Sequence, residues 1–254
     1  MLDGMEATIA TILPAPEDTA PAEAIDPDSD SPAMLVSEPA GQAIPAALNR
    51  LEVARNVIER HCGWDIGAEN VGKLLAARRN APSILQPYSR LVVKSNRPPH
   101  GEGLIPEIGD ATPIPGNRAV PTWQSKAQID EIFSPFDQAT AEHFARHPRC
   151  YSFSVHIFTP IFAGQSCPWH AGFVMRPMDF VQVAGSEALL ALDKPYRIDD
   201  ASDRFTPVHA EPRNIPHCMI EIRNDPVTAD DGTGKWAALS AAAIPEQRES
   251  TSCP

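Results

Sequence analysis

The 254-residue chain lacks three kinds of segment, and each absence excludes a class of protein. It has no apolar run near the ~20 residues that a membrane-spanning helix requires. It has no basic run, and its formal net charge of −12 is the opposite of the positive face that nucleic-acid-binding proteins present. The N-terminal stretch MLDGMEATIATILP carries acidic residues where a secretion signal needs positive charge. We therefore expect a cytoplasmic protein that binds neither nucleic acid nor membrane.

Cysteine is also scarce. The five cysteines are odd in number and show no C-x-x-C spacing, which predicts free thiols in place of a disulfide framework or a zinc ribbon. Hydrophobic residues make up 43% of the chain, enough at this length to form a sizeable core. One domain is the expected organisation.

Both ends of the chain have the composition of unfolded segments. Residues 14–33, PAPEDTAPAEAIDPDSDSPA, are rich in proline, alanine and acids and contain no aromatic residue. Such a segment cannot bury enough apolar surface to offset the entropy of ordering it. We expect a disordered leader over residues 1–32, a folded domain over 33–244 and a flexible tail over 245–254, PEQRESTSCP.

Strand-like and helix-like segments alternate within this domain. Apolar and β-rich runs predict strands at 33–37, 90–94, 150–158, 171–175 and 218–223. Helical spacing predicts helices at 46–61, 66–79 with Asp65 as N-cap, 124–147 with a kink at Pro135, and 230–243. This alternation predicts an α/β fold whose mixed, largely parallel sheet has helices on both faces. The Pro- and Gly-rich link 95–122 is long enough to be functional.

Charged residues in two predicted strands are candidates for a site. His156 lies in SVHIFTP, where it either lines a site or is a hydrogen-bonded core histidine. Glu221 and Arg223 are two residues apart in MIEIRND and so share one face of a strand. Two charges on an apolar strand are costly to bury without partners, which favours a functional role.

Two further pairs of residues fit either a functional or a structural role. Asn96 and Arg97 follow RLVVK, and an amide next to a guanidinium suits a substrate carboxylate, although Arg97 is equally explained as a surface arginine. His209 and Glu211 in PVHAE suit metal binding or proton transfer, or else a loop salt bridge.

The order of the motifs is more informative than any one of them. Eight stretches follow one another along the chain: WDIGA, YSRLVVKSNRPP, IPGN, SVHIFTP, PWHAG, KPYRI, PVHAE and IEIRND. Their order and spacing resemble those of the N-formylglutamate amidohydrolase family over about residues 34–244. The resemblance implies a three-layer sandwich similar to the zinc carboxypeptidase and aspartoacylase fold.

The resemblance also implies a reaction, the hydrolysis of N-formylglutamate to formate and glutamate in histidine breakdown. A zinc ion held partly by His156 would polarise the formyl carbonyl and activate water, and Glu221 would be the general base. Asn96 and Arg97 match the pair that clamps the substrate carboxylate. Arg90, Arg223 and His209 would be further site residues.

Two positions depart from the family pattern. Pro39 stands at the end of the first predicted strand, where open α/β sheets place ligands and where the family has a metal-binding histidine. Glu38 is able to ligate zinc, but the lost ligand should weaken binding. Lys94 stands where an aspartate is common. These changes keep a second reading open, a non-catalytic relative that binds a small carboxylate ligand or a protein partner.

Overall fold

The computed structural model describes residues 11–13, 15–146, 151–162, 164–175, 190–200, 203–229 and 231–244. Its strands are β1 Glu23–Ile25, β2 Ala33–Ser37, β3 Ser83–Leu85, β4 Ile108–Gly109, β5 Thr112–Pro113, β6 Tyr151–Phe158, β7 Ile161–Phe162, β8 Gln165–Ser166, β9 Ala171–Val174, β10 Leu190–Leu192 and β11 His217–Arg223. Its α-helices are α1 Arg55–Ile58, α2 Ala68–Arg79, α3 Thr122–Gln128, α4 Ser134–Arg146, α5 Asn224–Thr228 and α6 Gly232–Ala243. The 3₁₀ and π turns are η1 Ala46–Glu52, η2 Pro115–Asn117, η3 Ile129–Phe133, η4 Thr206–Ala210 and η5 Glu211–Arg213.

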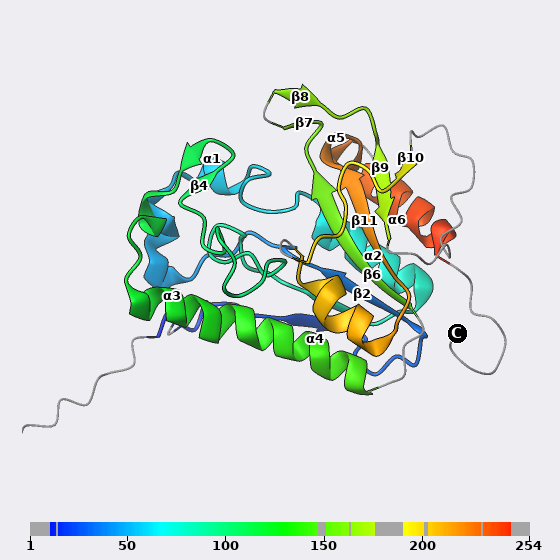
Figure 1. The fold of residues 1–254 in the computed structure, drawn as a ribbon, viewed down its shortest axis with the longest axis horizontal. Coiled ribbons are helices and arrows are strands. Elements are labelled where there is room, and N and C mark those ends of the chain that lie inside the picture. Colours follow the sequence, from blue (N-terminus) through cyan, green and yellow to red (C-terminus); the bar gives the residue numbers. More distant parts are fainter. Residues whose placement is uncertain are drawn as a thin grey trace, which may run out of the picture.

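A mixed sheet of seven strands forms the centre of the described chain, in the order β1-β3-β2-β6-β11-β9-β10 (Figure 1). The pairs β3–β2, β2–β6, β6–β11 and β9–β10 are parallel, whereas β1–β3 and β11–β9 are antiparallel. The expected α/β fold with a mixed, mostly parallel sheet is therefore confirmed.

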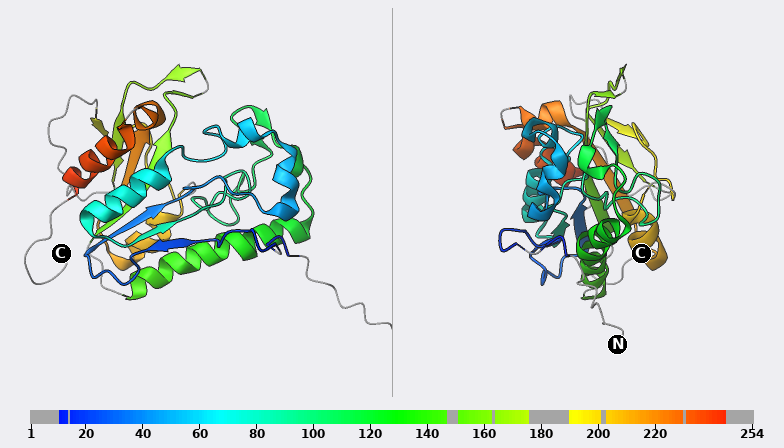
Figure 2. Two further views of the ribbon diagram at one scale, coloured as in Figure 1. Left: turned by 180° about the vertical axis from the view of Figure 1, so that it is seen from behind. Right: turned by 90° about the vertical axis from the view of Figure 1, so that its left-hand side faces the viewer.

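Helices cover both faces of this sheet (Figure 2). One face of β6, with Phe153, Val155 and Ile157, packs into a core that includes residues of α2 and α6. The other face of the sheet packs through β2 against Phe136 and Phe144 of α4. Because side chains alternate along a strand, the residues of β6 and β11 that point away from α2 and α6 face the side of α4 and η4.

The prediction of a strand at 90–94 is wrong, and β3 takes that place in the sheet. Leu91, Val92 and Val93 are buried in a second core under the long link. The carbonyls of Leu91 and Val92 accept hydrogen bonds from the side-chain amides of Asn117 (2.7 Å) and Gln128 (3.0 Å). The apolar run is therefore a buried turn whose backbone is satisfied by side chains.

The predicted helix 46–61 is also wrong as one element. It is split into η1 and α1 because Asn49, Arg50 and Leu51 adopt φ of 43°, 52° and 56°. Helix α2 is confirmed, but its N-cap is Gly67, at φ 94°, and not Asp65.

The helix predicted over 124–147 is confirmed for its described part, which runs from α3 through η3 to α4. The Ser134 N–H donates to the Ile129 carbonyl and closes the π turn one residue before Pro135. The three segments follow one line along the edge of the molecule in Figure 1, so the π turn takes the place of the expected kink.

The prediction of disorder over residues 1–32 is wrong for β1, which pairs with β3. The preceding segment is also held: Ile12 is 1% exposed, and its N–H lies 3.0 Å from a carboxylate oxygen of Glu131. The Tyr88 hydroxyl donates to the Thr19 carbonyl at 2.6 Å. Hydrogen bonds to the domain thus order a segment with little apolar surface. Residues 1–10, Pro14 and the predicted tail 245–254 lie outside the described part.

Among the described helices, none has the length and apolar character needed to cross a membrane. Cys62, Cys167 and Cys218 are free thiols, as predicted.

Candidate functional site

A cavity of about 500 Å³ lies beside the carboxyl-terminal halves of β6 and β11. Its walls come from these two strands, from the turn before α2, from the 90–110 segment and from Tyr196, Arg197 and Asp203. The carboxyl ends of parallel strands are the usual ligand side of an α/β sheet. The long link that the sequence marked as functional supplies much of the wall.

His156 and Glu221 face the cavity from adjacent strands. They are direct register partners in the parallel pair β6–β11, and both are buried. Neighbouring strands lie ~4.8 Å apart, so the sheet itself brings the imidazole and the carboxylate together. Burial raises the pKa of Glu221 to about 7, against the opposing effect of the His156 charge. Glu221 therefore exchanges its proton close to neutral pH.

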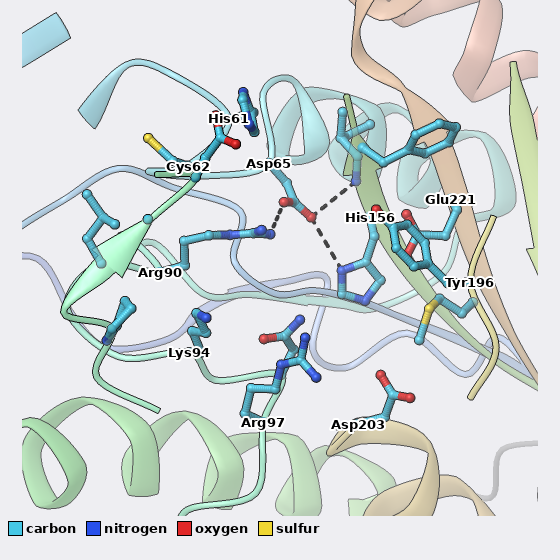
Figure 3. A pocket seen from close by; sticks show the side chains of 18 of the residues that line it. His61, Cys62, Asp65, Arg90, Lys94, Arg97, His156, Tyr196, Asp203 and Glu221 are labelled. Atoms are coloured by element: carbon cyan, nitrogen blue, oxygen red, sulfur yellow. Dashed lines mark hydrogen bonds and ion pairs between the residues drawn. The ribbon is translucent and has the colours of Figure 1, made fainter. Parts of the chain in front are cut away.

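Asp65 is a buried carboxylate that contacts His156, one member of this pair (Figure 3). One of its oxygens accepts the Ile157 N–H at 3.1 Å and lies 3.3 Å from His156 Nδ1. The other pairs with the Arg90 guanidinium. Burial alone would lower the pKa of His156, but the hydrogen bond to Asp65 and the charge of Glu221 raise it to about 9. The imidazole is accordingly positively charged at neutral pH.

Three of the four lysine and arginine side chains that line the cavity lie on the 90–97 segment, and Arg197 is the fourth. Arg90, Lys94, Asn96 and Arg97 all line the cavity, and Figure 3 places Lys94 between Arg90 and Arg97. Burial and the two guanidinium charges lower the pKa of Lys94. This wall is suited to an anionic ligand, because guanidinium and amide donors match the oxygens of a carboxylate.

Glu38, Arg223, His209 and Glu211 were candidates from the sequence but do not line the cavity. Glu38 is buried at the end of β2, where burial raises its pKa to about 8. Arg223 donates to Asp225 at 2.6 Å and to the Cys167 carbonyl at 3.0 Å, which ties β11 to a loop. His209 Nε2 lies 2.8 Å from the Asp137 carboxylate in a cluster with Arg204.

Several lining residues were missed or misassigned from the sequence, among them Asp65, Tyr196 and Asp203. Asp65 and Tyr196 stand in WDIGA and KPYRI, two of the motifs that carry the family resemblance, so that signal was present. Asp203 lies in DDASDR, which offers no recognisable pattern.

The described side chains of the cavity do not complete a zinc site. Within the described ranges, no three His, Cys, Asp or Glu side chains are grouped to hold a metal ion. The Pro39 side chain has no ligand atom, and Glu38 lies outside the cavity lining. Asp65 faces His156 Nδ1 and pairs with Arg90, so Nε2 is the nitrogen of His156 that is left as a donor. No metal ligand is therefore assigned in this cavity.

The fold is similar to two solved structures. The gene product Atu2144 from Agrobacterium tumefaciens is 24% identical with a TM-score of 0.82, over 89% of this chain and 93% of that chain. The N-formylglutamate amidohydrolase from Ralstonia eutropha JMP134 is 15% identical with a TM-score of 0.66, over 88% of this chain and 95% of that chain. At these identities the likeness is one of fold.

Sequence comparison gives the family. No curated protein sequence matches the chain at a significant level. The profile of the N-formylglutamate amidohydrolase family, however, matches residues 31–227. Because this match spans well over half of the residues and includes the cavity walls, the chain belongs to the N-formylglutamate amidohydrolase family.

Proposed function

We propose that this protein hydrolyses the N-acyl amide of a small amino acid derivative that carries a carboxylate, with N-formylglutamate the first compound to test. The observation that carries the proposal is the pairing of Glu221 with His156 in a cavity that also presents Asn96 and Arg97. The family's likeness to zinc carboxypeptidases and aspartoacylases, which share a three-layer sandwich, supports a hydrolytic role.

Substrate binding is assigned to the 90–97 wall. The Arg97 guanidinium offers two parallel N–H donors to a carboxylate, and the Asn96 amide adds a third. Arg90 is engaged by Asp65, so it supports the site by fixing that carboxylate. Bound in this way, the acyl amide reaches the β6–β11 side of the cavity.

Glu221 is assigned the role of general base. Its carboxylate takes a proton from water as the water oxygen bonds to the acyl carbon. The protonated Glu221 then returns that proton to the amide nitrogen as the C–N bond breaks, which yields the free acid and the amine. The charged His156 next to it stabilises the negative charge that develops on the acyl oxygen. No step is assigned to a metal ion.

The Glu221→Gln variant tests this assignment. Formate release from N-formylglutamate should disappear, while calorimetric affinity for the compound stays within about threefold, because the variant keeps the shape of the side chain. In the unmodified enzyme the rate should rise with pH through about 7, as the buried carboxyl loses its proton. The Glu142→Gln variant on α4 is the matched control. Turnover in Glu221→Gln would remove this residue from the mechanism.

A second candidate function is binding without catalysis. Pro39 favours it, because this position offers no metal ligand where the family pattern has a histidine. A protein that binds N-acyl amino acids but releases no product over hours, with or without added zinc, would be a binding protein for small carboxylates.

A further inference from the structure

One corner of the cavity is lined by small and apolar residues from three segments of the chain. We call it the apolar corner, and it consists of Cys62, Leu91, Pro106, Ile108 and Gly109. A Cβ atom on Gly109 would stand 3.1 Å from the Leu91 side chain and 3.5 Å from Cys62 Cβ, so Gly109 lies against both residues. The Asn117 side-chain amide donates to the Leu91 carbonyl at 2.7 Å and to the Pro106 carbonyl at 2.8 Å, which joins the other two segments.

Ile108 is the part of this corner that faces water. It lies in β4, which pairs with β5, and its register partner is Pro113. Its side chain is 65% exposed, whereas Leu91 behind it is fully buried. Apolar surface of this kind gains free energy when a ligand removes it from water. The apolar corner is therefore suited to an apolar group of the ligand.

The charged groups beside the apolar corner pair with one another. Asp110 Oδ2 lies 3.1 Å from Arg60 Nη2 and 3.1 Å from His61 Nε2. Arg90 pairs with Asp65. An acidic group of a ligand would lose its hydration at this corner and would meet the Asp110 carboxylate, which is costly. The surroundings thus favour an uncharged group.

The shape of the cavity shows which group of the substrate reaches this corner. Cys62, Glu221 and Arg97 lie on three different sides of the cavity in Figure 3. An N-acyl amino acid carries three groups on its α-carbon: the carboxylate, the acylated nitrogen and the side chain. With the carboxylate on the 90–97 wall and the amide at Glu221, the side chain is directed to the apolar corner. The cavity volume of about 500 Å³ leaves room for it, since sites for small molecules span ~300–1,000 Å³.

We propose that the substrate is an N-acyl amino acid with an aliphatic side chain, such as that of leucine, and that this side chain packs against Ile108 in the apolar corner. The inference rests on the proposed function, from which it takes the places of the carboxylate and of the amide.

Calorimetry of the full chain compares N-formylleucine with N-formylglutamate. N-formylleucine should bind about tenfold tighter or more, because its side chain leaves water in the apolar corner. Ile108→Lys places an ammonium group at this corner, so it should weaken the binding of N-formylleucine and strengthen that of N-formylglutamate. The ratio of the two affinities should fall at least about tenfold.

Ile161→Lys is the matched control. Ile161 is 60% exposed and also lies in a two-residue strand, β7, but it does not line the cavity. The ratio of affinities should stay unchanged in this variant. Both isoleucines are exposed, so both variants should fold, and circular dichroism checks this.

A third compound, N-hexanoylglutamate, carries the aliphatic chain on the acyl side. It should bind no tighter than N-formylglutamate. A gain in affinity from the hexanoyl chain that Ile108→Lys removes would place the acyl chain in the apolar corner and overturn this inference.

The outcomes separate the two proposals. Binding of N-formylglutamate as tight as that of N-formylleucine, or an unchanged ratio in Ile108→Lys, would overturn this inference, and release of formate from either compound would leave the proposed function standing. Failure of the unmodified protein to bind or hydrolyse any of the three compounds would refute the proposed function and this inference with it.

Discussion

Arg90 and Arg97 line one cavity but have different surroundings. Arg90 is only about a quarter exposed and its guanidinium contacts the nearly inaccessible Asp65, with side-chain exposures of 27% and 2%. Asp65 in turn orients His156, so Arg90 contributes to the order of the site. Arg97 stands at the other end of the cationic wall, next to Asn96. The two arginines should therefore respond differently to substitution.

Replacing Arg97 by lysine tests its assigned contact with the ligand carboxylate. Lysine lacks the two parallel donors, and a charge-assisted hydrogen bond is typically worth about 1.5–3 kcal/mol. Arg97→Lys should thus weaken binding of N-acyl amino acids by about one to two orders of magnitude. Calorimetry with the acid and with its carboxamide analogue measures the effect, and Arg118→Lys on the surface is the control. An equal loss for acid and amide would show that Arg97 acts structurally.

Helix α4 is joined to the segment that carries Asp203 by one cluster of charges. Arg204 donates to the two Asp137 oxygens at 2.9 and 2.8 Å, and His209 Nε2 lies 2.8 Å from the first of them. Burial would raise the pKa of Asp137, but the hydrogen bonds from His209 and Arg204 hold it well below its ordinary value. This cluster explains why His209 is placed away from the cavity.

Removing the charge of Asp137 should separate these two elements. Asp137→Asn should lower the free energy of unfolding in urea by about 1.5–3 kcal/mol at pH 7. Because the pKa of Asp137 is depressed in the folded state, its contribution is present at neutral pH and is lost in acid. The difference between the two proteins should shrink accordingly below about pH 4. Asp130→Asn, in an exposed pair with Lys126 on the same long helix, should change stability by less than about 0.5 kcal/mol. Equal effects of the two variants would contradict the role of the cluster.

Periodicity predicted the elements whose burial is regular along the chain. The strands that became β2, β6, β9 and β11, and the helices α2 and α6, were found because each packs one face or both against the core. The run 90–94 has the same composition as a strand, but its carbonyls are satisfied by Asn117 and Gln128, which are distant in sequence. The positive φ angles at 49–51 likewise carry no glycine signal. Local sequence patterns therefore reveal neither these distant hydrogen-bond partners nor the positive φ angles.

The candidate site was predictable in part for the same reason. The sequence places His156 and Glu221 on strands, and the family motifs assign both to one site. The structure shows them as register partners. Asp65 resembled an N-cap because aspartate before a helix usually is one. Its use as the partner of Arg90 and His156 depends on the fold and not on its neighbours in the chain.

The segment before β1 is attached to the long helical region that runs from α3 through η3 to α4. The backbone N–H groups of Ile12 and Leu13 donate to Glu131 in η3 at 3.0 Å, and the Thr11 hydroxyl donates to it at 2.6 Å. Residues that the sequence assigns to a disordered leader are thus joined to the middle of the chain.

Glu131→Ala should release this segment from the rest of the molecule. The carboxylate satisfies several donors at once, so its loss should lower stability by about 1–3 kcal/mol. Hydrogen exchange at Ile12 and Leu13 should become faster by at least an order of magnitude, whereas exchange in β6 should follow only the global change. Glu142→Ala, which removes an exposed contact with Gln138 on α4, is the control. Unchanged protection at Ile12 would show that this carboxylate does not anchor the segment.

The register between β6 and β11 fixes the spacing of two cavity residues while the other lining residues can change. Backbone hydrogen bonds between β6 and β11 set the separation of Glu221 and His156. Side-chain substitutions elsewhere leave these hydrogen bonds in place. Many of the other residues that line the cavity lie on the 90–110 segment, and Tyr196, Arg197 and Asp203 complete this wall. Substitutions at these lining positions can therefore change the shape and charge of the cavity while Glu221 and His156 keep their spacing. A directed-evolution library restricted to these positions should change ligand specificity and leave the Glu221–His156 pair in place.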